Sequence, residues 1–429
     1  MTNRRTKQEE GQHFIALFPG LVDIVEDRDH LAFMIIDRGK LEVIPTVALD
    51  GVTYHPPPRA QLTWAQFGIP GFEGVKQAFD NSEDPIRLLG SIVSYLEPLA
   101  ALPAPSYHYF MALWVMLTYL ADHPEVERIG IVNLFGDMER GKSRQLTGLG
   151  GVVYRPNLTE TVNEATLFRF ADYLGGTLLL DVSNFWPQVQ RRGSEEFFLI
   201  RFEKGRQIHR VKHPEAEPFK DLAHYEVFGP TVIATNHLAP PKFLSRTFPI
   251  SMPLKPGRYP QPDPGMGIQL RERLLAFRAR MLGTALPEPE LVGSGRWQDI
   301  SAPLTQLAKL MPAEMLAVLL HALEDMGHIR HEQERESVEA QVARCLAELR
   351  PKVTGGKLEM KLIRILLNEG IPERFQVSPQ KVGRVLSAFG FKKTKNRQYV
   401  YWDQGLVDAL QSQYGVEEVA KQCNRVAIS

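Results

Sequence analysis

Cysteine is nearly absent from this sequence of 429 residues, which holds only Cys345 and Cys423. Two cysteines without metal-ligand spacing exclude a disulfide framework and a cysteine-based zinc motif, and they predict a reduced, cytoplasmic protein. An excess of charge is absent too, because 50 Lys and Arg balance 50 Asp and Glu. Any affinity for nucleic acid must therefore come from local charge rather than from a global field.

Long apolar runs are also missing. The most apolar helix candidate, Phe110 to Leu120, is too short to cross a bilayer. We expect a buried helix there, because core packing explains its Met and aromatic side chains more readily than a ligand box. The start, Met1 to Lys7, is not followed by a signal-type apolar core. With 44% hydrophobic and 23% charged residues, the composition is that of a soluble globular protein, and no membrane partner is predicted.

One stretch, Gly136–Ser143, has the spelling of a phosphate-binding loop, G-x-x-x-x-G-K-S. Residues 129–135 before it form an apolar run that favours a buried parallel strand. Residues 143–146 behind it can begin a helix. The sequence therefore offers the strand–loop–helix context that the motif requires, although an ordinary strand-to-helix turn with a solvated lysine is the alternative.

Each residue type in the loop suits a different part of a nucleotide. Gly136 and Gly141 let backbone N–H groups wrap the phosphates. Lys142 would place a cation on the β- and γ-phosphates, and the Ser143 hydroxyl would ligate Mg²⁺. Arg144 follows directly and is included among the predicted ATP-binding residues.

Two later apolar runs end in polar residues. Thr177–Asp181 has a Walker B pattern and ends 39 residues after Lys142, where its carboxylate would hold Mg²⁺. The run from 230 ends at Asn236, which would polarise the attacking water. Ten residues later, Arg246 would reach a neighbouring subunit's nucleotide as an arginine finger. A turn-forming asparagine and a surface ion pair of the arginine are the alternatives.

Together these segments resemble the helicase-like AAA+ ATPases of phage, plasmid and integrative-element replication, over about residues 84–350. Residues 203–211 are similar to the family's pattern between Walker B and the sensor strand. The resemblance implies an α/β P-loop AAA+ core with a helical lid, which binds ATP and Mg²⁺. It also implies a homo-oligomeric ring, often a hexamer, that translocates DNA, and replication partners such as a primase. The catalytic roles that it implies fall on Lys142, Asp181, Asn236 and Arg246.

One position departs from that family. The Walker B aspartate is usually followed by a glutamate that activates water, and here Val182 follows Asp181. Loss of a positioned general base typically lowers the rate by ~10²–10⁴. Either ATP hydrolysis is slow, or another acid serves as the base, for which Glu139 and Glu195 are the candidates.

The C-terminal region carries the local charge. Residues 351–400 hold eleven Lys and Arg against three Glu, a local charge of +8. Helices are predicted at Leu358–Leu367 and Ser378–Phe389, followed by strand, basic turn and strand over residues 391–402, which indicates a winged helix. Its predicted DNA contacts are Lys381, Arg384, Lys392, Lys393, Lys395 and Arg397. A protein-binding winged helix is the alternative.

The predicted order is a small β-rich N-terminal domain (1–80), a helical connector (81–125), the AAA+ core (126–255), a helical lid (256–350) and the winged helix (351–429). The N-terminal domain contains a hairpin over Leu31–Ile44 and is either an interaction platform or a packing module. The leading function is a DNA-binding, helicase-like motor. The alternatives are a slowly hydrolysing, nucleotide-gated DNA switch or loader, and a protein remodeller.

Overall fold

The computed structural model describes residues 12–211, 222–372 and 376–414. The outer ends of the predicted terminal domains, residues 1–11 and 415–429, lie outside the described residues. The chain divides into two compact units, an N-terminal unit (Met1–Met326) and a C-terminal unit (Gly327–Ser429). The boundary falls within helix α11 (Ala313–Glu336).

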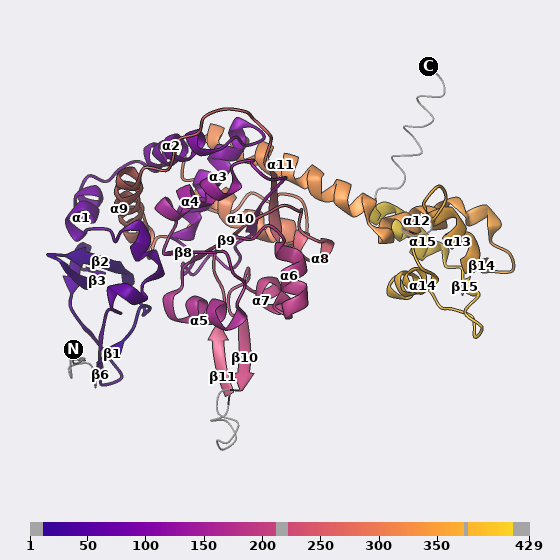
Figure 1. Ribbon diagram of the computed structural model, residues 1–429, viewed down its shortest axis with the longest axis horizontal. Coiled ribbons are helices and arrows are strands. Elements are labelled where there is room, and N and C mark those ends of the chain that lie inside the picture. The colour runs from indigo at the N-terminus through magenta and orange to yellow at the C-terminus, as the bar shows by residue number, and fades with distance from the viewer. Residues whose placement is uncertain (1–11, 212–221, 373–375, 415–429) are drawn as a thin grey trace, which may run out of the picture. The chain divides into compact units, whose positions relative to one another are not determined.

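A five-stranded parallel sheet forms the centre of the N-terminal unit (Figure 1). Its spatial order is β13 (Thr247–Ser251), β7 (Ile131–Phe135), β12 (Thr231–Thr235), β9 (Thr177–Asp181) and β8 (Pro156–Thr159). Alternate side chains enter two separate cores: Leu179 faces one, and Leu178 and Leu180 face the other. Because both faces are buried, these strands appear in the sequence as continuous apolar runs.

Helices cover both faces of this sheet. One core takes in residues of α2 (Pro85–Leu96), α3 (Pro105–Thr118), α4 (Lys142–Val152), α9 (Pro264–Met281) and α10 (Arg296–Ala308). The other takes in residues of α5 (Glu164–Leu174), α6 (Phe185–Arg192), α7 (Glu195–Ile200) and the short α8 (Pro241–Leu244). The expected buried helix is α3, in which Phe110, Trp114 and Leu117 are fully buried. The fold is therefore an α/β core with helices on both sides of a parallel sheet.

The N-terminal strands form two small sheets. β2 (Leu21–Asp27), β3 (His30–Asp37) and β4 (Lys40–Ile44) make an antiparallel meander. The predicted hairpin is present: Arg38 and Gly39 form its two-residue turn at φ 46° and 79°, the backbone of a type I′ turn. The second sheet contains β1 (His13–Phe14), β6 (Val52–His55) and β5 (Val47–Leu49), and α1 (Phe72–Asp80) follows.

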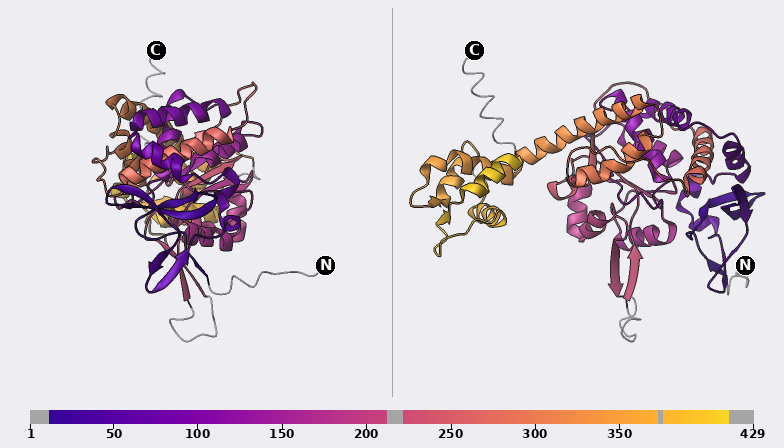
Figure 2. Two further views of the ribbon diagram at one scale, coloured as in Figure 1. Left: turned by 90° about the vertical axis from the view of Figure 1, so that its left-hand side faces the viewer. Right: turned by 180° about the vertical axis from the view of Figure 1, so that it is seen from behind.

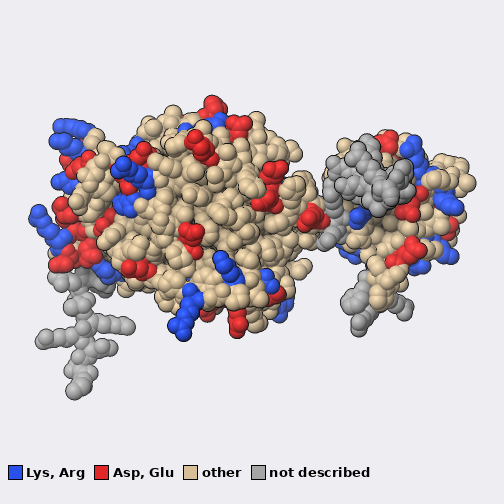
Figure 3. All heavy atoms as spheres, turned by 90° about the horizontal axis from the view of Figure 1, so that it is seen from above, with Lys and Arg blue, Asp and Glu red and all other residues tan. Residues whose placement is uncertain are grey.

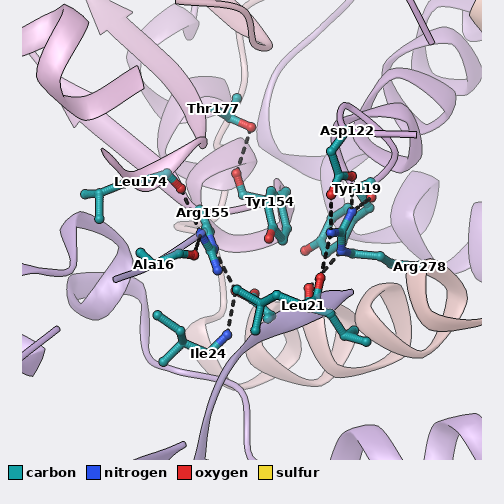
Figure 4. Close-up of polar contacts among 12 residues, drawn as sticks. Ala16, Leu21, Ile24, Tyr119, Asp122, Tyr154, Arg155, Leu174, Thr177 and Arg278 are labelled. Atoms are coloured by element: carbon teal, nitrogen blue, oxygen red, sulfur yellow. Dashed lines mark hydrogen bonds and ion pairs between the residues drawn. The ribbon is translucent and has the colours of Figure 1, made fainter. Parts of the chain in front are cut away.

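Buried charges fasten these N-terminal strands to the rest of the unit (Figure 4). Arg155 donates from Nε to Asp23 Oδ1 at 2.7 Å and from Nη1 to the carbonyl oxygens of Ala16 and Leu174. Arg278 of α9 donates to Asp122 Oδ2 at 2.6 Å and to the Val22 carbonyl oxygen at 2.8 Å. The meander is thus joined to the sheet and to α9 by two buried guanidinium groups, of which Arg155 pairs with the buried Asp23 and Arg278 pairs with the exposed Asp122.

The remaining elements extend the two units. Strands β10 (Gln207–Val211) and β11 (Leu222–Glu226) form a hairpin that projects from the sheet in Figures 1 and 2. The C-terminal unit contains α12 (Val338–Glu348), β14 (Lys357–Glu359), α13 (Met360–Leu367), α14 (Pro379–Ala388), β15 (Tyr399–Tyr401) and α15 (Gln404–Tyr414). On the face of the molecule that Figure 3 shows, Lys and Arg side chains are interspersed with Asp and Glu side chains.

Candidate functional site

The phosphate-loop motif lies between a strand and a helix, as its chemistry requires. β7 ends at Phe135 and α4 begins at Lys142. Gly141 has φ 80°, and a Cβ there would lie 3.1 Å from the Cβ of Ala100. Both the backbone angle and the close approach require glycine at this position. The loop therefore folds against residue 100 and presents the N-terminus of α4 to the space above the sheet.

A cavity of about 480 Å³ opens over this loop. It has the size of a small-molecule site. Most of the predicted nucleotide residues share it, although they come from three different parts of the chain. The lining residues are Met138, Glu139, Arg140, Gly141, Lys142, Ser143, Arg144, Asp181, Ser183, Ala234 and Asn236.

Lys142 is held inside the loop. Its Nζ donates to the carbonyl oxygens of Gly136 and Asp137, both at 2.6 Å. Burial lowers the pKa of Lys142, while the nearby Asp181 carboxylate opposes that shift. Because two neutral carbonyl oxygens are poor partners for a buried ammonium, an anion in this cavity would gain a strong ligand.

Two hard oxygen donors meet in the same cavity. The Ser143 hydroxyl and the Asp181 carboxylate both line it, and hydroxyl and carboxylate oxygens suit Mg²⁺. In the described ranges, no group of three or more His, Cys, Asp or Glu side chains is placed to hold a metal ion. A magnesium ion here would therefore complete its shell with phosphate oxygens and water, as this small cation commonly does.

The order of strands brings Asn236 to the cavity. β12 lies between β7 and β9, parallel to both, so the residue after its C-terminal end lies between the loop and Asp181. Asn133 is a buried residue whose role the sequence reasoning missed. Its Oδ1 accepts from the backbone N–H of Ala239 at 2.9 Å and thereby fixes the segment after Asn236. In the sequence, this role is indicated by a single polar residue within an otherwise apolar strand.

Arg140 is a second missed residue. It donates to the Met252 carbonyl oxygen at 3.0 Å and to Asp137 Oδ2 at 2.5 Å. These contacts tie the loop to the end of β13, and they account for a long charged side chain at a position where a small one is the simpler fit. The neighbouring Glu139 is exposed at φ 63° on the cavity wall.

The position after the Walker B aspartate faces away from the cavity. Val182 is buried in the same core as Leu180, and its backbone N–H donates to the Ala234 carbonyl oxygen. Among the proposed substitutes for the missing base, Glu139 lines the cavity, whereas Glu195 does not and pairs with Lys242. Within the part of the chain that the structure describes, Asp181 and Glu139 are the carboxylates of the cavity wall.

Arg246 is the predicted site residue that the fold keeps apart from this cavity. It precedes β13, and its carbonyl oxygen accepts from Ile131 at the start of β7. The phosphate loop follows the other end of β7. Five strand residues span roughly 17 Å, so Arg246 lies at the opposite edge of the sheet. Its Nη1 donates to the Lys242 carbonyl oxygen at 2.7 Å.

The C-terminal unit holds a second feature, a hollow of about 710 Å³. The predicted N-cap is present, since Ser378 Oγ accepts from the Lys381 backbone N–H at the start of α14. Three predicted DNA contacts, Arg384, Lys393 and Arg397, line this hollow. Lys381 does not line it, and its Nζ lies 3.5 Å from Glu339 Oε1 of α12. Lys392 and Lys395 are exposed outside the hollow.

Comparisons of sequence give no match: no protein-family model fits the chain, and no curated protein is significantly similar. Comparisons of structure give distant likenesses. The A-form apo structure of the NrS-1 C-terminal region is 10% identical, covers 90% of this chain and 97% of that one, and has a TM-score of 0.32. The SCCmec type IV Cch active helicase is 11% identical, covers 80% of this chain and 72% of that one, and has a TM-score of 0.34.

A third likeness is to the structure of Drosophila ORC bound to DNA. It is 13% identical, covers 77% of this chain and 92% of that one, and has a TM-score of 0.18. Scores this low leave the function to be inferred from the residues themselves. None of the helices in the described ranges is long and apolar enough to span a membrane.

Proposed function

We propose that this protein is an ATP- and DNA-binding AAA+ ATPase of the helicase-like kind, acting in mobile-element replication. The observation that carries the proposal is one cavity that collects the phosphate loop, Asp181 and Asn236 from three strand ends. The strand order supports it, because β12 lies between the loop strand β7 and the Walker B strand β9 and so brings Asn236 between them.

Each residue has a defined task in this proposal. Lys142 leaves the loop carbonyl oxygens and binds the β- and γ-phosphates, while Ser143 and Asp181 hold Mg²⁺. Asn236 orients the attacking water. When bound, the magnesium ion neutralises phosphate charge. Arg246, at the other edge of the sheet, serves a neighbouring subunit, so ATP lies between subunits of a ring.

The position of Val182 favours a specific alternative, a switch or loader that binds ATP and hydrolyses it slowly. An aliphatic side chain packed in the core cannot activate water, and among the described lining residues of the cavity Glu139 is the carboxylate other than Asp181. In that case ATP binding drives assembly on DNA and turnover resets it. A protein remodeller whose C-terminal unit binds a protein is the third candidate.

The order of elements in the C-terminal unit supports the winged-helix proposal. The chain runs helix, strand, two helices, and then a strand that pairs antiparallel with the first, as β14 does with β15. An isolated bridge from Lys393 to Val400 adds a short third partner. With a local charge of +8 in the sequence, DNA is the partner that this charge suits best.

The decisive test is nucleotide binding by wild-type protein and a Lys142→Ala variant, titrated with a fluorescent ATP analogue and Mg²⁺. We expect the variant to bind at least about 10-fold more weakly, because a charge-assisted phosphate contact is lost. Lys204→Ala, which removes a lysine outside the cavity, is the control and should bind normally. Equal affinity of wild type and Lys142→Ala would refute the site. ATP turnover with and without forked DNA then separates the motor from the slow switch.

A further inference from the structure

The hollow of the C-terminal unit has a wall that the sequence did not single out. Besides Arg384, Lys393 and Arg397, it is lined by Lys361 and Arg364 of α13. Five cations from two helices and a turn therefore surround one space, with Glu359 as the only carboxylate among its lining residues. This arrangement is more specific than a basic surface, because the charges converge on one space.

Local structure explains why α13 contributes two of them. Lys361 and Arg364 are three residues apart and so share a helix face, and both are exposed. Ile363 and Leu367 lie in the hydrophobic core on the other side. α13 packs against α14, and the pair of helices holds its basic face beside Arg384.

The turn after α14 closes the hollow. Gly383 of α14 lies next to the turn, since a Cβ at that position would be in ordinary van der Waals contact with Lys393 Nζ at 3.4 Å and with Met360 Cε at 3.6 Å. None of the five cations has an ion-pair partner among the described residues of this unit. Lys381, one residue after the hollow-lining Gln380, turns away and pairs with Glu339.

We propose that this hollow is a backbone-phosphate site for duplex DNA, built by Lys361 and Arg364 of α13 together with Arg384, Lys393 and Arg397, and that Lys381 takes no part in it. The inference rests on the proposed DNA binding of the C-terminal unit and deepens it. In a helix-turn-helix arrangement the first helix crosses the DNA backbone while the start of the second enters the major groove. The positions of α13 and α14 at the hollow suit that geometry.

The test compares a Lys361→Gln/Arg364→Gln double variant with Lys381→Gln in the full chain. Anisotropy of a labelled duplex and of the matching single strand is measured over a series of salt concentrations. The double variant should bind duplex roughly 10- to 100-fold more weakly at about 0.1 M salt. The slope of log K against log salt should fall by up to about 1.8, since each lost phosphate contact removes ~0.9. Lys381→Gln should stay within about two-fold of wild type, and Lys361→Arg should retain binding.

The outcomes are distinguishable. If the double variant binds duplex as tightly as the wild type does, the proposed site is wrong. Equal losses in the double variant and in Lys381→Gln would also overturn it, because they would mean diffuse attraction to a basic surface. A loss confined to single strands would overturn the duplex assignment. Wild-type protein that binds neither duplex nor single strand would instead refute the proposed DNA-binding function. Thermal unfolding of each variant checks that these exposed substitutions leave the fold intact.

Discussion

Arg201 is fully buried, and no carboxylate of the described residues pairs with it. Its guanidinium donates to the Thr231 hydroxyl and to the carbonyl oxygens of Gly176, Val227 and Pro230, at 2.7–3.2 Å. Burial lowers its pKa, because the surroundings supply dipoles but no negative charge. Gly176 directly precedes β9, Pro230 and Thr231 lie at the start of β12, and Val227 follows β11. One side chain therefore fixes the spacing of β9 and β12, the strands that lead to Asp181 and Asn236.

Removal of this side chain should be costly. Arg201→Met leaves three buried carbonyl oxygens without that donor, and we expect the free energy of unfolding to fall by about 3–5 kcal/mol. Arg206→Met is the matched control, since Arg206 is exposed and pairs with Glu203 at the surface, where a pair contributes at most about 1 kcal/mol. Urea denaturation measures both. An Arg201→Met midpoint equal to that of wild type would mean that the carbonyl oxygens have other donors.

At the scale of elements, the N-terminal meander is part of the N-terminal unit rather than an appended module. β2 presents Asp23 to a guanidinium with no exposed surface, Arg155, and Glu26 to an exposed one, Arg59. The same strand therefore makes one buried and one surface ion pair. The arginines of α9 also pair within the N-terminal unit, although the helix looks basic in the sequence. Arg278 donates to Asp122, and Arg273 donates to Glu83.

The two ion pairs of β2 predict different mutational costs. Asp23→Ala leaves a buried guanidinium uncompensated, and we expect about 3–5 kcal/mol of destabilisation. Glu26→Ala should cost less than about 1 kcal/mol. Chemical denaturation gives the free energy of unfolding of both variants. Equal losses of stability in the two would show that burial of the Asp23–Arg155 pair does not determine how much it stabilises the fold.

The Asp122–Arg278 pair predicts a pH dependence. Burial alone would raise the pKa of Asp122, but the hydrogen bond and charge of Arg278 lower it below its usual value. The folded pKa is therefore below the unfolded value of about 3.9. The stability that this carboxylate contributes is present above about pH 4 and is lost as the pH falls through the folded pKa.

Urea unfolding of wild type and Asp122→Asn from pH 7 to pH 3 checks this sign. The difference between their free energies of unfolding should be largest near neutrality and should shrink below about pH 4. A difference that stays constant over the range would contradict the proposed linkage.

At the scale of the whole molecule, the sheet separates Arg246 from the phosphate loop of its own chain. Arg246 is half-buried, and its Nε has no hydrogen-bond partner among the described residues. Its Nη1 donates to the Lys242 carbonyl oxygen. A nucleotide contact by this residue therefore requires a second copy of the chain. The proposed ring would meet that requirement.

Mixing variants tests the requirement. Arg246→Ala should bind the ATP analogue as wild type does but lose turnover by about 10³-fold or more. Mixing it with inactive Lys142→Ala should restore part of the turnover, because the second variant supplies the arginine to the intact site of the first. Mixtures without restored turnover would exclude a role in trans.

The local patterns were determined by the sequence alone. The Gly136–Ser143 spelling, the β7 and β9 runs and the Ser378 cap each depend on neighbours a few residues apart, which set backbone geometry and periodicity. The α/β class follows because strands buried on both faces leave continuous apolar runs.

The tertiary structure decided which distant residues share a space. Strand order placed Asn236 with Lys142 and Asp181 and kept Arg246 away, and helix packing turned Lys381 toward Glu339 while adding Lys361 and Arg364 to the basic hollow. It also placed Val182 in the core and gave the α9 arginines internal partners. Spacing along a chain cannot reveal these outcomes, because each depends on side chains that meet only when segments far apart in sequence pack together.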